Sequence, residues 1–388
     1  MIHPIPVFIA DARRSPIGRF RGALKSLDAA DVALQVAQAI IPEELKPHVD
    51  QVILGQVLAA GSGMNVARQL GLRLGLPQRS PGFTLNMACA SGLKAVALAA
   101  EAVASGESSL ALAGGTESMS RAPHYAREMR GGRKLGDSVL VDSIHADALT
   151  DPVLQVAMGE TAERLAIDYN ITREEQDAFA LASQQRAAAS REAFRRELVT
   201  METREGRLVS DEHPRPDTTI QTLATLKPAF RENGTVTPGN ASGMNDGAAL
   251  LLVGSERAIR DHSLKPRARI VASAAVGCDP SAMGLGPIHA IESLCARTGW
   301  ELDKVGAIEI NEAFAVQTLA CARGLRLDRE KLNRRGGAIA LGHPLGCSGA
   351  RVLVTLLHIL EDHDLNRGIA SLCVGGGMGI AMAIERDI

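Results

Sequence analysis

Short apolar runs alternate with amphipathic stretches along the first part of the chain. Runs typical of buried strands occur at residues 6–11, 49–58, 83–87 and 109–115. Stretches with apolar residues three and four positions apart, the spacing of one helix face, occur at residues 27–41, at 67–76 and after residue 89. Strands that alternate with helices in this way predict a parallel or mixed sheet covered by helices, which is the arrangement of the α/β class.

The pattern changes near residue 118. Residues 120–137 are basic, polar and rich in turn formers. Two helices are predicted next, over Gly159–Ala166 and from Thr172 onward, where Glu175 completes the spacing of a capping box. Alternation of strand and helix returns at residue 247 and continues to the end. We therefore expect an insertion with a small core of its own inside an α/β chain.

Two parts of the chain resemble each other. "CASG" and "GCSG" each place a Ser-Gly pair at the start of an apolar helix, and each helix leads to a strand that ends in glycines. The later strand meets three glycines at 375–377, which predict a hairpin between two buried strands. This similarity favours two related halves, although any strand–helix unit with glycine-rich turns would look alike.

Composition narrows the possible functions. The 388 residues are 46% hydrophobic and 22% charged with a net charge of −2, so a nucleic-acid partner is not expected. Six cysteines without a CxxC pair indicate neither a disulfide scaffold nor a zinc site, and no metal is expected. Asp11 and two arginines come too early for a secretory signal. We expect a cytoplasmic protein that does not enter a membrane.

Four places carry reactive side chains at the end of a strand or the start of a helix. Cys89 precedes a helix, whose N-terminus lowers a thiol pKa, although free cysteines are more often buried hydrophobic residues. His343 lies between glycine turns, and Cys373 ends a strand where core packing is the alternative. Asn311 and Glu312 follow an apolar run, where an N-cap is the alternative. Ligands bind at such ends in open α/β sheets.

These residues lie within motifs that resemble the thiolase family, in the family's order and from end to end. The motifs are "RSPIGRFRG", "NMACASGLKA", "AGGTESMS", "GNASGMNDGAA", "NEAFAVQ", "GGAIALGHPLGCSGAR" and "CVGGGMGIA". The stretches "SRAPHY", "RGGRKLGD" and "EEQDAFA" are similar to the short-chain, acetoacetyl-type members. The resemblance implies two duplicated halves in a five-layer α-β-α-β-α sandwich. It divides the chain into an N-terminal half (1–117 and 246–265), a loop domain that holds coenzyme A (118–245) and a C-terminal half (266–388).

The resemblance also implies an acyltransferase that reversibly condenses two acetyl-CoA molecules to acetoacetyl-CoA and CoA. Cys89 would carry the acetyl group, His343 would accept its thiol proton, and Cys373 would remove the α-proton of the second acetyl-CoA. One oxyanion hole would use His343 and a water held by Asn311, and the other the backbone N–H groups of Cys89 and Gly375. Coenzyme A thioesters are the substrates, and no further cofactor is implied.

Coenzyme A contacts are implied for four residues. Ser242 and Met158 would contact the pantetheine, and Arg215 and Thr222 the nucleotide end, although a solvated surface charge is the alternative for Arg215. One position departs from the family, because Ala157 stands where many acetoacetyl-type members have histidine. The resemblance further implies a role in fatty acid metabolism and a homotetramer or homodimer.

Three other functions compete with this interpretation. A degradative 3-ketoacyl-CoA thiolase would use the same residues with a longer pocket. A non-catalytic acyl-CoA or lipid carrier would be expected to lose Cys89, His343 or Cys373, and all three are present. A decarboxylating ketosynthase would carry a second histidine or an asparagine at position 373.

Overall fold

Two sets of strands form the framework of the protein; the first has one additional edge strand, and the other four strands match those of the second set in order and direction. The computed structural model describes residues 2–387. The first set, in spatial order, is β4 (Gly82–Leu85), β3 (Gln51–Gly55), β5 (Leu110–Ser118), β10 (Asn245–Ser255) and β1 (Ile2–Arg14). The second is β12 (Ala307–Ile310), β13 (Arg367–Val374), β14 (Met378–Glu385) and β11 (Ala268–Gly277).

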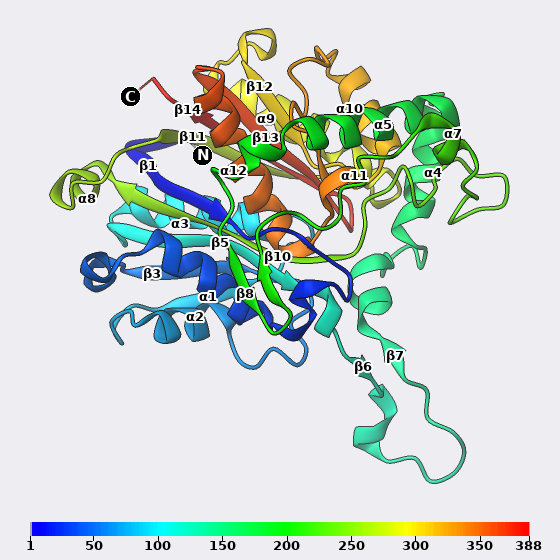
Figure 1. Ribbon diagram of the computed structural model, residues 1–388, viewed down its shortest axis with the longest axis horizontal. Coiled ribbons are helices and arrows are strands. Elements are labelled where there is room, and N and C mark those ends of the chain that lie inside the picture. The colour runs from blue at the N-terminus through cyan, green and yellow to red at the C-terminus, as the bar shows by residue number, and fades with distance from the viewer. Residues whose placement is uncertain (1, 388) are drawn as a thin grey trace.

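Each set has parallel strands at its outer side and antiparallel strands at its inner side. β3 runs parallel to β4 and β5, whereas β10 runs antiparallel to β5 and β1. β12 likewise runs parallel to β13, and β14 runs antiparallel to β13 and β11. β1 and β11 pair and join the halves (Figure 1). The predicted duplication is therefore confirmed, as is the hairpin at residues 375–377 between β13 and β14.

The two similar helices lie at the centre of the molecule. α3 (Ser91–Ser105) and α12 (Leu345–Asp362) pack on each other between the two sets of strands. They approach so closely that a Cβ on Gly349 would lie 2.4 Å from the backbone nitrogen of Leu93. A Cβ on Gly92 would lie 2.7 Å from the carbonyl oxygen of Gly346. The repeated Ser-Gly pairs thus mark the crossing of two helices whose N-termini meet.

Helices also cover the outer faces of the strands. α1 (Ala29–Ile40) and α2 (Val66–Leu74) cover the first half, and α9 (Gly286–Thr298), with α10 (Ala315–Gly324) beside it, covers the second. α1 begins at a capping box between Asp28 and Asp31 and buries Val32 and Val36. Together with the central helices and the strands they make the five layers α-β-α-β-α.

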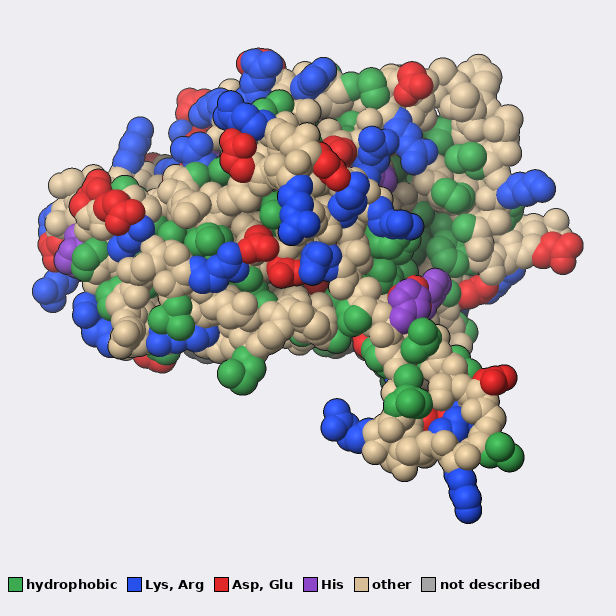
Figure 2. Space-filling model, turned by 60° about the horizontal axis from the view of Figure 1, so that its bottom comes forward, with side chains coloured by type: hydrophobic (Ala, Val, Ile, Leu, Met, Phe, Trp, Pro, Cys, Tyr) green, Lys and Arg blue, Asp and Glu red, His purple; other side chains and the backbone are tan. Residues whose placement is uncertain are grey.

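The chain between β5 and β10 leaves this framework. It contains α4 (Met158–Asp168), α5 (Arg173–Ala189), α6 (Arg191–Phe194), α7 (Ile220–Ala224), and the short strands β6 (His124–Tyr125), β7 (Val141–Asp142), β8 (Met201–Thr203) and β9 (Gly206–Leu208). The remaining short elements are β2 (Gly18–Arg19), α8 (Glu256–Asp261) and α11 (Ala338–Leu341). The capping box at Thr172 and Glu175 is confirmed. β6 and β7 form the neck of an arm that projects from the body (Figures 1 and 2).

The prediction that this segment has a core of its own is wrong. Its apolar side chains, including Leu165, Phe179 and Val236, belong to one cluster with Phe314 and Cys373 of the C-terminal half. α4 and α5 each have one apolar face, and α10 supplies the surface that buries it. The segment is thereby held against the strand that carries Cys373.

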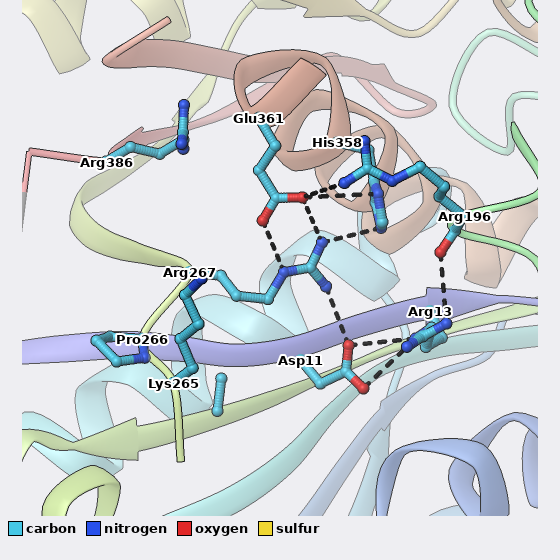
Figure 3. Close-up of a pocket in the computed structure, with 10 residues that line it drawn as sticks. Asp11, Arg13, Arg196, Lys265, Pro266, Arg267, His358, Glu361 and Arg386 are labelled. Carbon is cyan, nitrogen blue, oxygen red and sulfur yellow. Dashed lines mark hydrogen bonds and ion pairs between the residues drawn. The ribbon is translucent and has the colours of Figure 1, made fainter. Parts of the chain in front are cut away.

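A polar cleft of about 890 Å³ lies between the two halves, at β1, the start of β11 and the end of α12 (Figure 3). Arg267 donates to Asp11 at 3.0 Å and to Glu361 at 2.8 Å, and Arg196 also pairs with Glu361. Arg13 pairs with Asp11. Since these arginines already have carboxylate partners, we interpret the cleft as an ion-pair network that ties the halves together.

Candidate active site

The turn between β4 and α3 holds Cys89 through local hydrogen bonds. The hydroxyl of Ser91 accepts from the N–H of Met87 at 2.8 Å and donates to the carbonyl of Ala88 at 2.7 Å. Ala88 adopts a left-handed conformation with φ of 44°. This tight turn places Cys89 one residue ahead of the helix N-cap, Ala90, with the backbone N–H groups of Gly375 and of Cys89 itself close to its sulfur.

Apolar side chains surround the partly buried Cys89. The thiol packs against a cluster made of Val57, Leu58, Met119, Ile144 and Leu345. Burial raises its pKa to about 11, with a smaller contribution from the charge of Glu117, and the two backbone N–H groups only partly oppose this. The expectation of a lowered thiol pKa is therefore wrong, because Cys89 precedes the N-cap and desolvation outweighs the field of the helix. At neutral pH the thiol is protonated, so it needs a base.

His343 is held just ahead of α12 by hydrogen bonds at its ring. Its Nδ1 lies 2.5 Å from the hydroxyl oxygen of Ser348, which itself donates to the carbonyl of Pro344 at 2.8 Å. Because the hydroxyl has only one proton, Nδ1 must carry the imidazole proton and Nε2 must be the free acceptor. Burial, with the positive charge of Arg351, lowers the pKa of His343 to about 3. The neutral imidazole thus presents Nε2 to the site.

Asn311 lies directly beside that nitrogen. Its side-chain Nδ2 is 3.4 Å from Nε2 of His343, and its Oδ1 is 3.5 Å from Nη2 of Arg351. The backbone N–H of Asn311 donates to the carbonyl of Ser371 on β13 at 3.0 Å. Asn311 is not an N-cap, because α10 begins after Phe314. The N-cap alternative is therefore excluded.

Glu312 fixes the backbone around Asn311. Its carboxylate accepts from the hydroxyl of Ser183 at 2.6 Å, from Nδ2 of Asn333 at 2.9 Å and from the N–H of Ile339 at 3.2 Å. These partners come from three separate segments. Burial raises the pKa of Glu312, and the three donors oppose that shift. Glu312 thus anchors the loop that carries the amide of Asn311.

Cys373 lies at the second-last position of β13, close to Cys89. It is 1% exposed, and burial followed by the nearby charge of Cys89 raises its pKa well above the usual range. The hairpin that follows places Gly375 near the Cys89 sulfur. The sulfur of Met158 lies 3.3 Å from the position that a Cβ on Gly375 would take. The structure therefore brings Cys89, Cys373, Gly375 and Met158 together.

The buried carboxylate of Glu117 connects the surroundings of Cys89 with the segment that carries His343. Glu117 accepts from the N–H groups of Val57 at 2.9 Å, Leu58 at 3.1 Å and Gly346 at 2.8 Å. Burial raises the pKa of Glu117 to about 7. Since Gly346 lies in the first turn of α12, this carboxylate ties the apolar wall around Cys89 to the helix that follows His343.

Sequence reasoning missed Glu117, Ser348 and Arg351 as site residues, although all three lie in the quoted motifs. A signal for Arg351 was present. Arg351, Thr355 and His358 are four and three residues apart in a helix that is mostly apolar between them, and all three are buried. A polar stripe on one face of a buried helix indicates partners inside the protein.

The four residues expected to bind coenzyme A lie in two places. Met158 lies at Gly375, and the N–H of Ser242 donates to the carbonyl of Ala313 at 2.9 Å, next to Gly243, whose carbonyl accepts from His343. Arg215 and Thr222 are exposed and line a pocket of about 210 Å³. The hydroxyl of Thr222 donates to the carbonyl of Thr219 in a helix cap.

One wall residue links that pocket to the reactive groups. His213 lines the pocket, and its Nδ1 lies 3.3 Å from Nδ2 of Asn245. Oδ1 of Asn245 accepts from the N–H of His343 at 3.0 Å. Among residues 2–387 no three His, Cys, Asp or Glu side chains lie together as metal ligands would. The arrangement suits nucleophilic acyl transfer: a thiol, a neutral imidazole, a second thiol and paired backbone N–H donors.

Comparison with known proteins identifies relatives with this architecture. The model for "Thiolase, N-terminal domain" matches residues 7–257, and that for "Thiolase, C-terminal domain" matches residues 264–386. An acetyl-CoA acetyltransferase of Allochromatium vinosum is 46% identical over 389 residues, covering 98% of this chain and 99% of the relative. The crystal structure of the Bacillus anthracis acetyl-CoA acetyltransferase is 44% identical with a TM-score of 0.94, covering 98% of both chains.

A second solved structure is as similar in shape. The human mitochondrial 3-ketoacyl-CoA thiolase in complex with CoA is 42% identical with a TM-score of 0.96. The match covers 100% of this chain and 99% of that one. The same fold and chain length therefore serve proteins named for different acyl substrates.

Proposed function

Because the chain belongs to the thiolase family, we propose that it catalyses the reversible condensation of two acetyl-CoA molecules to acetoacetyl-CoA and CoA. The observation that carries this proposal is the convergence of two thiols, Cys89 and Cys373, with the backbone N–H groups of Cys89 and Gly375. One thiol and its base would suffice for simple hydrolysis or acyl transfer. A second buried thiol beside the acyl carrier supports a step that removes a carbon-bound proton.

In the first step Nε2 of His343 accepts the thiol proton of Cys89 as the sulfur attacks the thioester carbonyl. The pKa values of the two groups disfavour a resting thiolate–imidazolium pair, so the proton moves as the carbon–sulfur bond forms. The N–H groups of Cys89 and Gly375 stabilise the tetrahedral oxyanion. CoA leaves as a thiolate and takes a proton from Cys373, which leaves acetyl-Cys89, a Cys373 thiolate and protonated His343.

In the second step the Cys373 thiolate removes the α-proton of another acetyl-CoA. His343 and the amide of Asn311 stabilise the enolate oxygen, and the enolate carbon attacks acetyl-Cys89. Collapse of the tetrahedral intermediate releases acetoacetyl-CoA and the Cys89 thiolate, which recovers its proton from His343. All three residues return to their starting protonation states, so the cycle balances without a cofactor.

The contacts proposed for coenzyme A follow the two places described above. Ser242 and Met158 lie beside the reactive groups and would contact the pantetheine. Arg215 and Thr222 line an exposed pocket, which supports contact with the nucleotide. Since the chain has Ala157 ahead of Met158, no imidazole side chain contributes to binding at that position.

The acyl chain length is tested by thiolysis of 3-ketoacyl-CoA substrates from C4 to C16. The aliphatic cluster packed against Cys89 supports a short acyl group, and we expect acetoacetyl-CoA to give the highest kcat/KM. The similarity to the human 3-ketoacyl-CoA thiolase supports the degradative alternative. A preference for C10 or longer chains would establish that alternative instead.

We further propose a homotetramer or homodimer that acts in the cytoplasm in fatty acid metabolism. The arm exposes 91% of Leu135 and 73% of Val139, as well as Met129 and Leu140, and apolar groups exposed together in this way favour a protein partner. Six free thiols support a reducing compartment. Light scattering of the purified protein and of a variant with Leu135 and Val139 changed to serine would show whether the arm contributes to assembly.

A further inference from the structure

Arg351 places a guanidinium group in the interior of the protein, next to the side-chain amide of Asn311. It is 1% exposed, and its Nη2 lies 3.5 Å from Oδ1 of Asn311. Its Nε and Nη1 form no hydrogen bond in the part of the chain that the structure describes. Burial lowers the pKa of Arg351, and the carboxyl groups of Glu309, Glu197 and Glu312 oppose that shift. A buried guanidinium with so few hydrogen bonds is costly, which suggests that its position serves a purpose.

The two neighbours of Asn311 permit only one orientation of its amide. An arginine can only donate, so the group facing Arg351 must be the oxygen. In the resting protein, where His343 is neutral, Nε2 can only accept, because Ser348 engages the proton on Nδ1. The group facing His343 must therefore be the NH₂. A flipped amide would place donor against donor at Arg351 and acceptor against acceptor at His343.

We propose that Arg351 is a positioning residue that holds the Asn311 amide with its NH₂ toward His343 and the enolate oxygen. Arg351 acts through Asn311 and does not itself touch the reacting atoms. This inference rests on the proposed function, in which Asn311 serves only the enolate step. Acetylation of Cys89 uses the backbone N–H groups of Cys89 and Gly375, which Arg351 does not contact in the described structure.

Loss of Arg351 should therefore separate the two half-reactions. In Arg351→Met, a side chain of similar length fills the space without a donor. We expect exchange of the acetyl-CoA α-protons with D₂O to slow by about 10- to 100-fold, as for a weakened oxyanion donor. At pH 8, where His343 is neutral with or without the charge of Arg351, transfer of labelled acetyl to Cys89 should stay within about 3-fold of the unsubstituted protein, because its oxyanion hole is intact. For the full condensation, kcat should fall with little change in KM.

Arg335→Met is the matched control. Arg335 is also a buried arginine, 3% exposed, and it pairs with Asp362 near the far end of α12. Arg335 and Arg351 both interact with the charges of Glu309 and Glu197. Arg335 has no contact with Asn311 among the described residues, so its loss should affect stability and leave the ratio of the two half-reactions unchanged.

A double-mutant cycle with Asn311→Ala tests whether the two residues act as one unit. If Arg351 works through Asn311, then Arg351→Met should slow exchange by less than about 3-fold in the Asn311→Ala background. Should Arg351→Met fail to fold, Arg351→Lys decides, because lysine keeps the buried charge but ends short of Oδ1. It should slow exchange while leaving acetylation unchanged.

Three results would overturn the proposal: equal loss of both half-reactions in Arg351→Met, the same separation in Arg335→Met, or an undiminished effect of Arg351→Met when Asn311 is already alanine. Wild-type exchange in Arg351→Lys would also overturn it. Failure of the proposed function is distinguishable, because the unsubstituted protein would then show neither acetylation nor exchange.

Discussion

Replacement of Gly349 by alanine should damage catalysis far more than stability. The added Cβ would lie 2.4 Å from the backbone nitrogen of Leu93, whereas ordinary van der Waals contact begins at 3.4 Å. Neither partner can move aside alone, since one is the backbone of α3 and the other belongs to α12. The two helices must therefore separate by about 1 Å, and Cys89 and His343 lie just ahead of their N-termini.

The expected loss of stability is small, whereas the expected loss of catalytic rate is large. Overpacking a core costs about 1–3 kcal/mol. Unfolding entropy of roughly 2.1 cal/mol/K per residue, over 388 residues, converts this to a fall in Tm of about 1–4 °C. A displacement of about 1 Å between catalytic groups can lower the rate about 100-fold. We therefore expect a folded protein with a slightly lower Tm and a kcat reduced by about two orders of magnitude.

Calorimetry and a thiolysis assay with acetoacetyl-CoA measure the two effects on the same preparation. Gly131→Ala is the control, because Gly131 lies in the exposed arm and a Cβ there would meet nothing within 4 Å. It should leave both Tm and kcat unchanged. A Gly349→Ala protein with kcat within 3-fold of the unsubstituted enzyme would refute the argument that the helix crossing sets the alignment of Cys89 and His343.

The remaining predictions concern the two thiols. Cys89→Ser should take up no stable label from radioactive acetyl-CoA at position 89 and should lose nearly all turnover; near-normal turnover would rule out Cys89 as the acyl carrier. Cys373→Ala should abolish α-proton exchange and condensation but still allow slow acetylation of Cys89; the reverse pattern would show that the roles are misassigned. Because burial raises the pKa of Cys89 to about 11, the rate of Cys89 alkylation by iodoacetamide, followed by peptide mapping, should rise with pH beyond neutrality toward that value. An alkylation rate that reaches a plateau below pH 8 would contradict the raised pKa.

Features that depend on residues close together in the chain could be predicted from the sequence. The capping box at Thr172 and the hairpin at residues 375–377 arise from local backbone geometry, and the structure has both. The alternation of strands and helices followed from periodicity, because a buried face repeats every two residues in a strand and about every 3.6 in a helix. The repeated Ser-Gly pairs pointed to the two related halves, and the motifs pointed to the reactive residues.

The tertiary structure alone decided how those residues behave. The raised pKa of Cys89 comes from its burial among side chains of separate segments, and the free Nε2 of His343 comes from the hydroxyl of Ser348. The orientation of the Asn311 amide depends on Arg351, 40 residues away. The insertion shares a core with α10 because its helices cannot bury their apolar faces alone. Desolvation and hydrogen-bond partnership are properties of the space around an atom, and folding fills that space with groups that are far apart in the chain.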